Sequence, residues 1–229
     1  MEIELNSYTI QYNGTDIVLP YSAVQHLLLE ECIVLLLASW TRPTEEVGYI
    51  DDPVDISLPS IDRNVLALSL DGTHLWTAAE APHETPEDEA EYNYRYLFTI
   101  DGRLFVRHQS GYLYELDTDT GDILADWLDN YLPIGEQAVE LAGSIDRVVS
   151  VDDIVVVRVI GVDQDEGDTY GFAKDGTQLW RSDTYFGNVY LSDGELHAKR
   201  AVGPRRSIEY VVDPETGSVL DEEEVPDFN

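Results

Sequence analysis

The chain has 229 residues, and 43% of them are hydrophobic, which is enough to bury a sizeable core in one domain. Its 13 Lys and Arg residues stand against 46 Asp and Glu residues, so the formal net charge is −33. A surface this acidic repels phosphate, which disfavours nucleic acid and anionic membranes as partners, and 14 Tyr, 5 Phe and 4 Trp residues argue against a disordered chain.

The first twenty residues predict short strands around the Asn13-Gly14 dipeptide, which is typical of a tight hairpin. We expect residues 1–20 to close or cap the repeat domain that follows. The opening Met-Glu-Ile-Glu-Leu has neither the basic region nor the apolar region of a signal peptide, so we expect a cytoplasmic protein.

Residues 24–38 are rich in leucine and are interrupted by Glu30 and Glu31, too short an apolar run to cross a bilayer. One interpretation is a helix; the match to the later repeats favours two strands instead. Cys32 is the single cysteine, so it forms no intramolecular disulfide, and its acidic neighbours are expected to raise its pKa.

Residues 40–63 form a long insertion, and insertions of this length in compact domains are often functional. A Trp beside an Arg is a suitable anchor for a partner, which makes Trp40 and Arg42 candidate binding residues. The alternative is that they pack over the end of the domain.

Four segments of the chain share one turn pattern, in which an Asp is followed by a Gly and then by a Leu three residues beyond the Gly. The Gly supplies the positive φ of a tight hairpin, and the Leu is expected to anchor the next strand. The four segments are Leu70–Trp76, Asp117–Leu124, Lys174–Trp180 and Asp213–Leu220. We therefore expect Leu75, Leu124, Leu179 and Leu220 to be buried on corresponding strands.

Each of these turns belongs to a longer unit of four predicted strands; the unit after residue 95 places four strands and three turns in about 33 residues. The units span about 24–80, 95–129, 146–183 and 187–224, and 1–229 is expected to form a single domain. Such a repeat predicts an all-β fold, a small β-propeller of about four blades, each a four-stranded antiparallel sheet. The alternatives are a β-sandwich, or a half-ring that dimerises.

Two of the turns resemble PQQ-type β-propeller repeats, whose pattern is Ala-x-Asp-x-x-Thr-Gly-x-x-x-Trp. Asp117, Thr120 and Gly121 match this pattern, as do Asp213, Thr216 and Gly217. The small residue is replaced by Glu115 or Val211 and the tryptophan by Ala125 or Asp221, whereas the other two units keep Trp76 and Trp180 on shorter turns. The resemblance implies blade architecture without a quinone site. The acidic composition, for its part, resembles that of proteins from salt-loaded haloarchaea.

Basic residues are rare in this chain, and Arg107, Arg158 and Lys199 fall at the same position of three units, with Leu37 at that position of the first unit. One interpretation is a cationic collar that binds an anion or an acidic tail. The other, which we favour, is that each cation pairs with a carboxylate of its own sheet.

No catalytic motif, metal-ligand spacing or cofactor fingerprint stands out, so we predict no metal and no cofactor. The stretch Asp163–Asp168 resembles a calcium loop, but its twelfth position is Lys174, where a calcium loop needs Glu. The predicted function is a non-enzymatic binding or scaffolding module with a protein partner. The alternative is a hydrolase or lyase that uses polar residues in the propeller channel, and both a monomer and a homodimer are compatible with the sequence.

Overall fold

A computed structural model shows an all-β chain and describes residues 3–6, 8–12, 15–19, 21–38, 64–83, 94–163 and 167–226. The chain divides into two compact units. The first consists of Met1–Phe98 with Arg103–Asp126, and the second of Thr99–Gly102 with Trp127–Asn229. Within the described ranges, no helix has the length and apolar character needed to cross a membrane.

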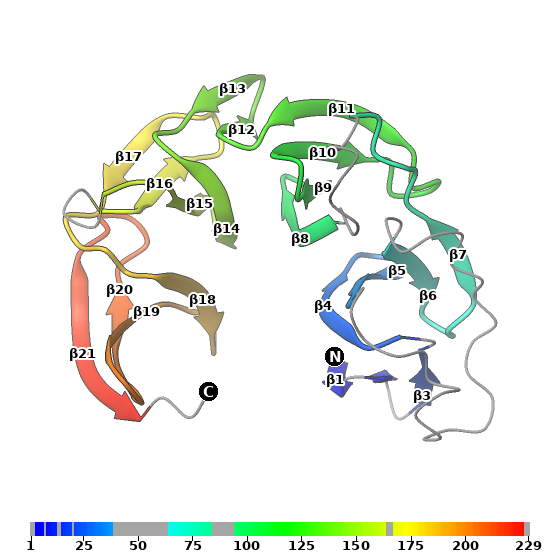
Figure 1. Ribbon diagram of the computed structural model, residues 1–229, viewed down its shortest axis with the longest axis horizontal. Helices are drawn as coiled ribbons and strands as arrows, with labels where there is room; N and C mark the ends of the chain where they lie inside the picture. The colour runs from blue at the N-terminus through cyan, green and yellow to red at the C-terminus, as the bar shows by residue number, and fades with distance from the viewer. Residues whose placement is uncertain are drawn as a thin grey trace. The chain divides into compact units, whose positions relative to one another are not determined.

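The first unit contains a small three-stranded sheet followed by two four-stranded antiparallel sheets (Figure 1). The small sheet has β1 (Ile3–Asn6), β2 (Thr9–Tyr12) and β3 (Thr15–Val18). The next has β4 (Ala23–Leu28), β5 (Cys32–Leu37), β6 (Val65–Ser69) and β7 (His74–Thr77). The last has β8 (Tyr94–Ile100), β9 (Arg103–His108), β10 (Tyr112–Leu116) and β11 (Ile123–Leu128), whose ends extend into the second unit.

The second unit has the same order of parts (Figure 1). It begins with the hairpin of β12 (Tyr131–Ile134) and β13 (Gln137–Glu140). The first four-stranded sheet has β14 (Ser144–Val151), β15 (Ile154–Ile160), β16 (Thr169–Ala173) and β17 (Gln178–Arg181). The second has β18 (Asn188–Ser192), β19 (Glu195–Gly203), β20 (Arg206–Val212) and β21 (Val219–Pro226).

The prediction of an all-β fold with four four-stranded antiparallel sheets is confirmed. Residues 24–38 form the strands β4 and β5 rather than a helix, and all six residues of β5 are buried. One face of β5 carries Ile33 and Leu35 into a core shared with Ile10 and Ile17 of the small sheet. The other face carries Val34 into the core shared with β8–β10. A strand that is buried on both faces does not need to alternate apolar and polar residues, which explains the continuous run of apolar residues in β5.

The four repeated leucines lie on corresponding strands, because each is in the fourth and last strand of its sheet. The predicted burial of these side chains is wrong, since Leu75, Leu124, Leu179 and Leu220 are 50%, 59%, 46% and 65% exposed. Successive side chains of a strand point to opposite faces, so the residue after the leucine takes the inner position. Trp76 and Trp180 occupy it in the first sheet of each unit and are buried.

The two units share one arrangement of strands. The sequence pattern predicts four equal repeats instead of two larger ones. Each starts with a hairpin closed by the same backbone hydrogen bond: Leu19 N donates to Tyr8 O at 2.8 Å, and Leu141 N donates to Asn130 O at 2.8 Å. Ala23 and Ile145 then begin the same irregularity in the first strand of the following sheet. The hairpin and the sheet after it therefore form one repeated structure.

Within each unit, a tryptophan of the first sheet is bonded to a turn of the second sheet. Trp76 Nε1 donates to Thr118 O at 2.8 Å, and Trp180 Nε1 donates to Pro214 O at 2.7 Å. The Gly of each of those turns has a positive φ, 74° at Gly121 and 71° at Gly217, and a Cβ there would lie 2.6 Å from the indole ring. The Asp-x-x-Thr-Gly turn is therefore shaped to receive the tryptophan of the preceding sheet.

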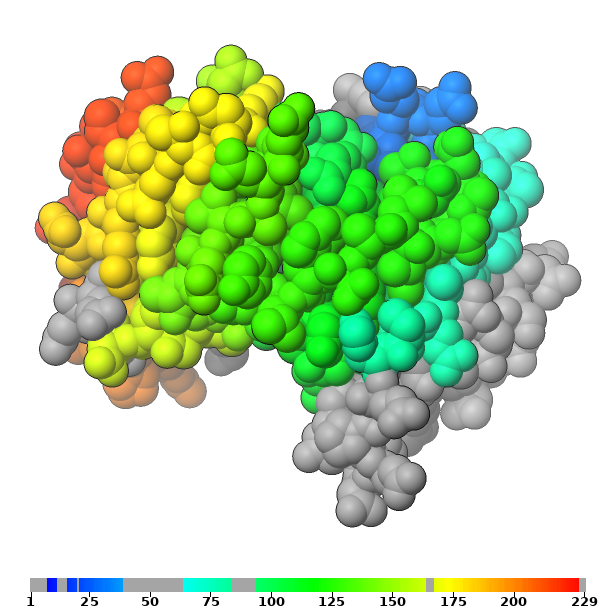
Figure 2. All heavy atoms as spheres, turned by 90° about the horizontal axis from the view of Figure 1, so that it is seen from above, coloured from blue at the N-terminus to red at the C-terminus, as the bar shows by residue number. Residues whose placement is uncertain are grey.

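The core between the two sheets of each unit also repeats. The ring of Tyr94 contacts that of Tyr114 in the first unit, with centroids 6.1 Å apart, and Phe186 contacts Tyr210 in the second at 5.4 Å. In each unit, the two four-stranded sheets thus share a core that contains an aromatic pair. Outside that core, the outer strands lie at the surface, as the green segment around β11 shows in Figure 2.

Candidate functional site

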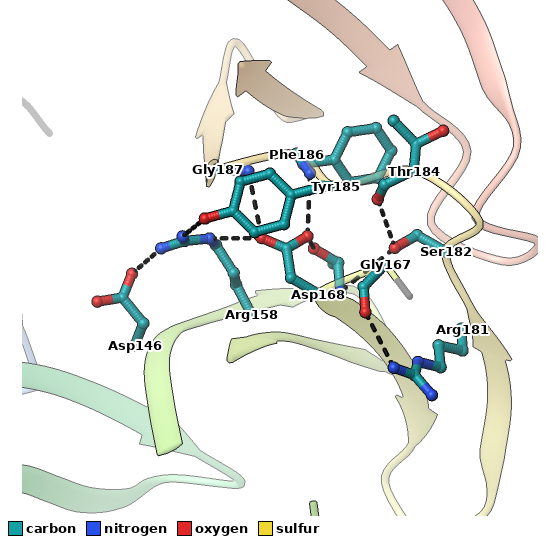
Figure 3. A network of polar contacts seen from close by, with 11 residues as sticks. Asp146, Arg158, Gly167, Asp168, Arg181, Ser182, Thr184, Tyr185, Phe186 and Gly187 are labelled. Carbon is teal, nitrogen blue, oxygen red and sulfur yellow. Dashed lines mark hydrogen bonds and ion pairs between the residues drawn. The ribbon is translucent and has the colours of Figure 1, made fainter. Parts of the chain in front are cut away.

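A network of polar contacts surrounds Asp168 in the second unit (Figure 3). Asp168 immediately precedes β16 and is fully buried. Arg158 comes from β15 and Asp146 from β14, while Tyr185 and Phe186 belong to the connection between β17 and β18. The network therefore joins three strands of one sheet to the segment that enters the next sheet.

The carboxylate of Asp168 accepts four hydrogen bonds. Its Oδ1 accepts from Thr169 Oγ1 at 3.0 Å and from the amide of Phe186 at 3.0 Å. Its Oδ2 accepts from Arg158 Nε at 2.8 Å and from the amide of Gly187 at 3.2 Å. A buried carboxylate that accepts this many hydrogen bonds has little capacity left for a ligand.

Arg158 is the cation of the network and is itself buried, with a side chain that is 9% exposed. It bonds to Asp168 on one side and to the half-exposed Asp146 on the other, and its Nη2 donates to Tyr185 Oη at 3.3 Å. Burial opposes the charged form, but the hydrogen bond and charges of Asp168 and Asp146 outweigh it and raise the pKa of Arg158. The guanidinium is therefore held permanently between two carboxylates.

Further hydrogen bonds hold the end of the same sheet. The hydroxyl of Ser182 donates to Thr184 O at 2.9 Å, and Arg181 Nη2 donates to Gly167 O at 3.1 Å (Figure 3). These bonds fix the start of the segment that contributes Tyr185, and Asp168 holds its end through Phe186 and Gly187. Chemically, the arrangement is a saturated ion-pair cluster that positions the start of β18.

The first unit has an uncharged version of this cluster. Asn64 precedes β6 as Asp168 precedes β16, and its Oδ1 accepts from the amide of Tyr94 at 3.0 Å, as Asp168 does from Phe186. The strand register pairs Leu36 with Val65, where the second unit pairs Arg158 with Thr169. Leu36 is buried in the apolar core. The fold therefore accepts either a leucine or an arginine at this position.

The same register corrects the sequence alignment at one point. Arg107, Arg158 and Lys199 each lie six residues after a turn aspartate with positive φ, namely Asp101 (51°), Asp152 (52°) and Asp193 (51°). In the first sheet the equivalent residue is Leu36 and not Leu37. One residue matters here, because neighbouring positions of a strand face opposite sides of the sheet.

The candidate cations lie on the second strands of their sheets. Arg107 is half-buried on β9 of the first unit, and Lys199 is half-buried on β19, directly opposite Glu209. Arg158 is paired with Asp146 and Asp168, as the structural interpretation expected. The other two candidates, Trp40 and Arg42, lie outside the described residues.

Sequence reasoning missed the partners of Arg158. It placed Asp168 in a resemblance to a calcium loop, whereas the carboxylate is occupied by protein donors. No sequence pattern marks Tyr185 or Asp146. Asp168 could have been found by comparison with Asn64, because each of the two residues directly precedes the third strand of its sheet. No group of three or more His, Cys, Asp or Glu residues in the described ranges is placed to hold a metal ion.

Four antiparallel four-stranded sheets in succession define a β-propeller of four blades. The chain belongs to the family described as Domain of unknown function (DUF7957), whose model matches residues 54–128 and, separately, residues 124–224.

Among solved structures, the chain is similar to the β-propeller domain of Cps50 (Swd1) from Myceliophteria thermophila, with 10% identity and a TM-score of 0.54. The similarity covers 97% of this chain and 68% of that one. BamB from Moraxella catarrhalis is 14% identical with a TM-score of 0.43, over 97% of this chain and 60% of BamB. The chain thus spans less than two thirds of BamB. No functionally curated protein matches the sequence.

Proposed function

We propose that this protein is a non-enzymatic binding or scaffolding module with a protein partner. The observation that carries the proposal is that every blade exposes a leucine at the same place on its outer strand. Isolated exposed leucines are common, but one at an equivalent position of all four blades is a repeated surface feature. Leu128, at the end of β11, is also exposed.

The polar network around Asp168 argues against catalysis at that position. A general base needs a lone pair directed at a substrate, and a nucleophile needs an activating neighbour. The oxygens of Asp168 are occupied by protein donors, and Arg158 is held between two carboxylates. Cys32 is also a poor nucleophile, because burial, together with the charges of Asp119 and Glu31, raises its pKa.

Three further expectations belong to this proposal. The Asp-x-x-Thr-Gly turns support membership of the PQQ-like type of repeat, without a quinone. The net charge of −33 supports the proposal that the protein functions in a salt-rich cytoplasm like that of haloarchaea, where ions screen the repulsion between acidic side chains. Arg107 and Lys199 are proposed as secondary binding residues, since both are half-buried cations on a very acidic chain.

The test is affinity capture from native cell extract in molar KCl, followed by binding measurements with the purified partner. Leu124→Lys and Leu179→Lys should each weaken binding at least tenfold, because a charge replaces an apolar contact. Leu191→Lys is the matched control, since Leu191 is also exposed but lies on the first strand β18. Equal binding by all three variants would overturn the proposal.

A further inference from the structure

The first unit contains a histidine that is stacked on a tyrosine and bonded to a carboxylate. The ring of His83 lies over that of Tyr112, with centroids 3.6 Å apart and planes 14° from parallel. His83 Nε2 lies 2.7 Å from Asp126 Oδ2, and the two side chains are 34% and 44% exposed. An imidazole is thus held flat on an aromatic face by an acid at its edge.

Behind this pair lies the buried side chain of Tyr114. Its hydroxyl interacts with the Ser110 side chain and with the backbone of His83. The rings of Tyr112 and His83 are 6.3 and 6.0 Å from its ring. Tyr114 therefore helps to hold His83 over Tyr112.

The second unit shows that the fold does not require this cluster. Its core repeats Tyr114 as Tyr210, but it has Ile208 where the first unit has Tyr112. The position of Asp126 is taken by Glu222, with no stacked histidine beside it among the described residues. A duplicated fold that is stable without the stacked platform indicates that His83, Tyr112 and Asp126 serve something other than folding.

We propose that Tyr112 and Asp126 form a binding site for the guanidinium group of an arginine side chain on a protein partner. A guanidinium is planar, stacks on aromatic faces and forms paired hydrogen bonds with a carboxylate. It also carries five N–H donors, so it can bond both oxygens of the Asp126 carboxylate. The strongly acidic chain favours a basic group over any anionic ligand.

His83 occupies this site as an internal substitute for the ligand. Its imidazole is planar and carries an N–H donor, so it reproduces the stacking and one hydrogen bond of a guanidinium. Partly exposed ion pairs contribute little net stability, so an incoming arginine can displace it. For a ligand that competes with an internal group, the apparent Kd is the intrinsic Kd divided by the fraction of molecules in which the site is open.

This inference rests on the proposed function, since it names the side chain through which a protein partner would bind. The experiment is a titration of the whole chain in molar KCl, followed by NMR of the His83 and Tyr112 rings. The probe is N-acetyl-arginine methylamide, and the comparison probes are its lysine and citrulline counterparts. Arginine should give saturable shifts as His83 leaves the Tyr112 ring, and the other two probes should bind at least fivefold more weakly.

Four variants distinguish specific binding of arginine at this site from its nonspecific attraction to the acidic surface. Asp126→Asn and Tyr112→Ile should each weaken arginine binding at least fivefold, and Tyr112→Ile copies the residue of the second unit. His83→Ala should tighten binding about threefold or more, because the internal competitor is gone. Glu222→Gln is the matched control and should change nothing.

The inference is overturned by equal binding of arginine and lysine, by equal effects of Asp126→Asn and Glu222→Gln, or by unchanged affinity in His83→Ala. Melting curves in the same buffer identify any variant that fails to fold. If arginine does not bind but the chain still captures a partner through its exposed leucines, this inference is wrong and the proposed function stands.

Discussion

Asp168 and Phe186 are joined by a 3.0 Å hydrogen bond from the backbone amide to the carboxylate, and the same bond in the other unit joins Asn64 and Tyr94. An uncharged amide and a charged acid thus perform the same structural task. The difference is that the acid brings with it a buried arginine, whereas the amide sits beside a buried leucine.

Removing one charge of the Arg158–Asp168 pair should destabilise the fold more than removing both. Arg158→Leu leaves Asp168 buried without its cation and should destabilise the fold by about 3–5 kcal/mol. The double variant Arg158→Leu with Asp168→Asn copies Leu36 and Asn64 and should recover most of that loss. Chemical denaturation in molar KCl measures both. A double variant less stable than Arg158→Leu would show that the two units do not share this arrangement.

The tryptophans rather than the leucines should anchor the outer strands. Trp180→Ala removes a buried ring and its hydrogen bond to Pro214, and should cost about 3–5 kcal/mol. Leu179→Ala changes an exposed side chain and should stay within about 0.5 kcal/mol of the parent. Trp76→Ala and Leu75→Ala repeat the comparison in the first unit. A large effect of Leu179→Ala in denaturant titrations would contradict the exposed position.

Two glycines with similar backbone angles should respond differently to alanine. Gly194 has a φ of 82° and open space around its Cα, so Gly194→Ala carries only backbone strain of about 1–2 kcal/mol. Gly217 has a φ of 71°, and an added methyl group would also press on Trp180. Gly217→Ala should therefore lower the melting temperature more than Gly194→Ala. Equal shifts would mean that the indole moves aside at no cost.

Stability should rise with salt. At molar KCl the screening length falls to about 3 Å, which suppresses repulsion among 46 acidic residues. The melting temperature should therefore increase steadily from low to molar KCl. A flat profile would show that other forces outweigh this repulsion.

Acid should destabilise the turns that join the third and fourth strands. Hydrogen bonds from nearby backbone amides lower the pKa of Asp117 and Asp213. Because their folded pKa lies below the unfolded value of about 3.9, their contribution is complete above that value and is lost as the pH falls through the folded pKa. Asp117→Asn with Asp213→Asn should flatten the decline of melting temperature below about pH 4 in molar KCl. An unchanged decline would assign it to other acids.

Much of the fold could be predicted from the sequence, because turn residues and strand patterns are local signals. Gly121 and Gly217 marked hairpins that the structure contains, and both turns fall between third and fourth strands. Which face of an outer strand is buried could not be read from the leucines, because that depends on the neighbouring sheet. The partners of Arg158 were hidden because they depend on the folded arrangement: the pairing of β15 with β16 brings Asp168 to it, and the connection between β17 and β18 brings Tyr185.

The ion pair between Arg158 and Asp168 also constrains the order in which the two units diverged. From an ancestor with Leu and Asn at these positions, gaining the aspartate first would leave an acid in the interior without a cation. Gaining the arginine first is easier, because Asp146, which is half-exposed, already offers it a partner at the edge of the sheet. From such an ancestor, we expect the arginine to precede the aspartate, and relatives with Arg and Asn together would represent the intermediate.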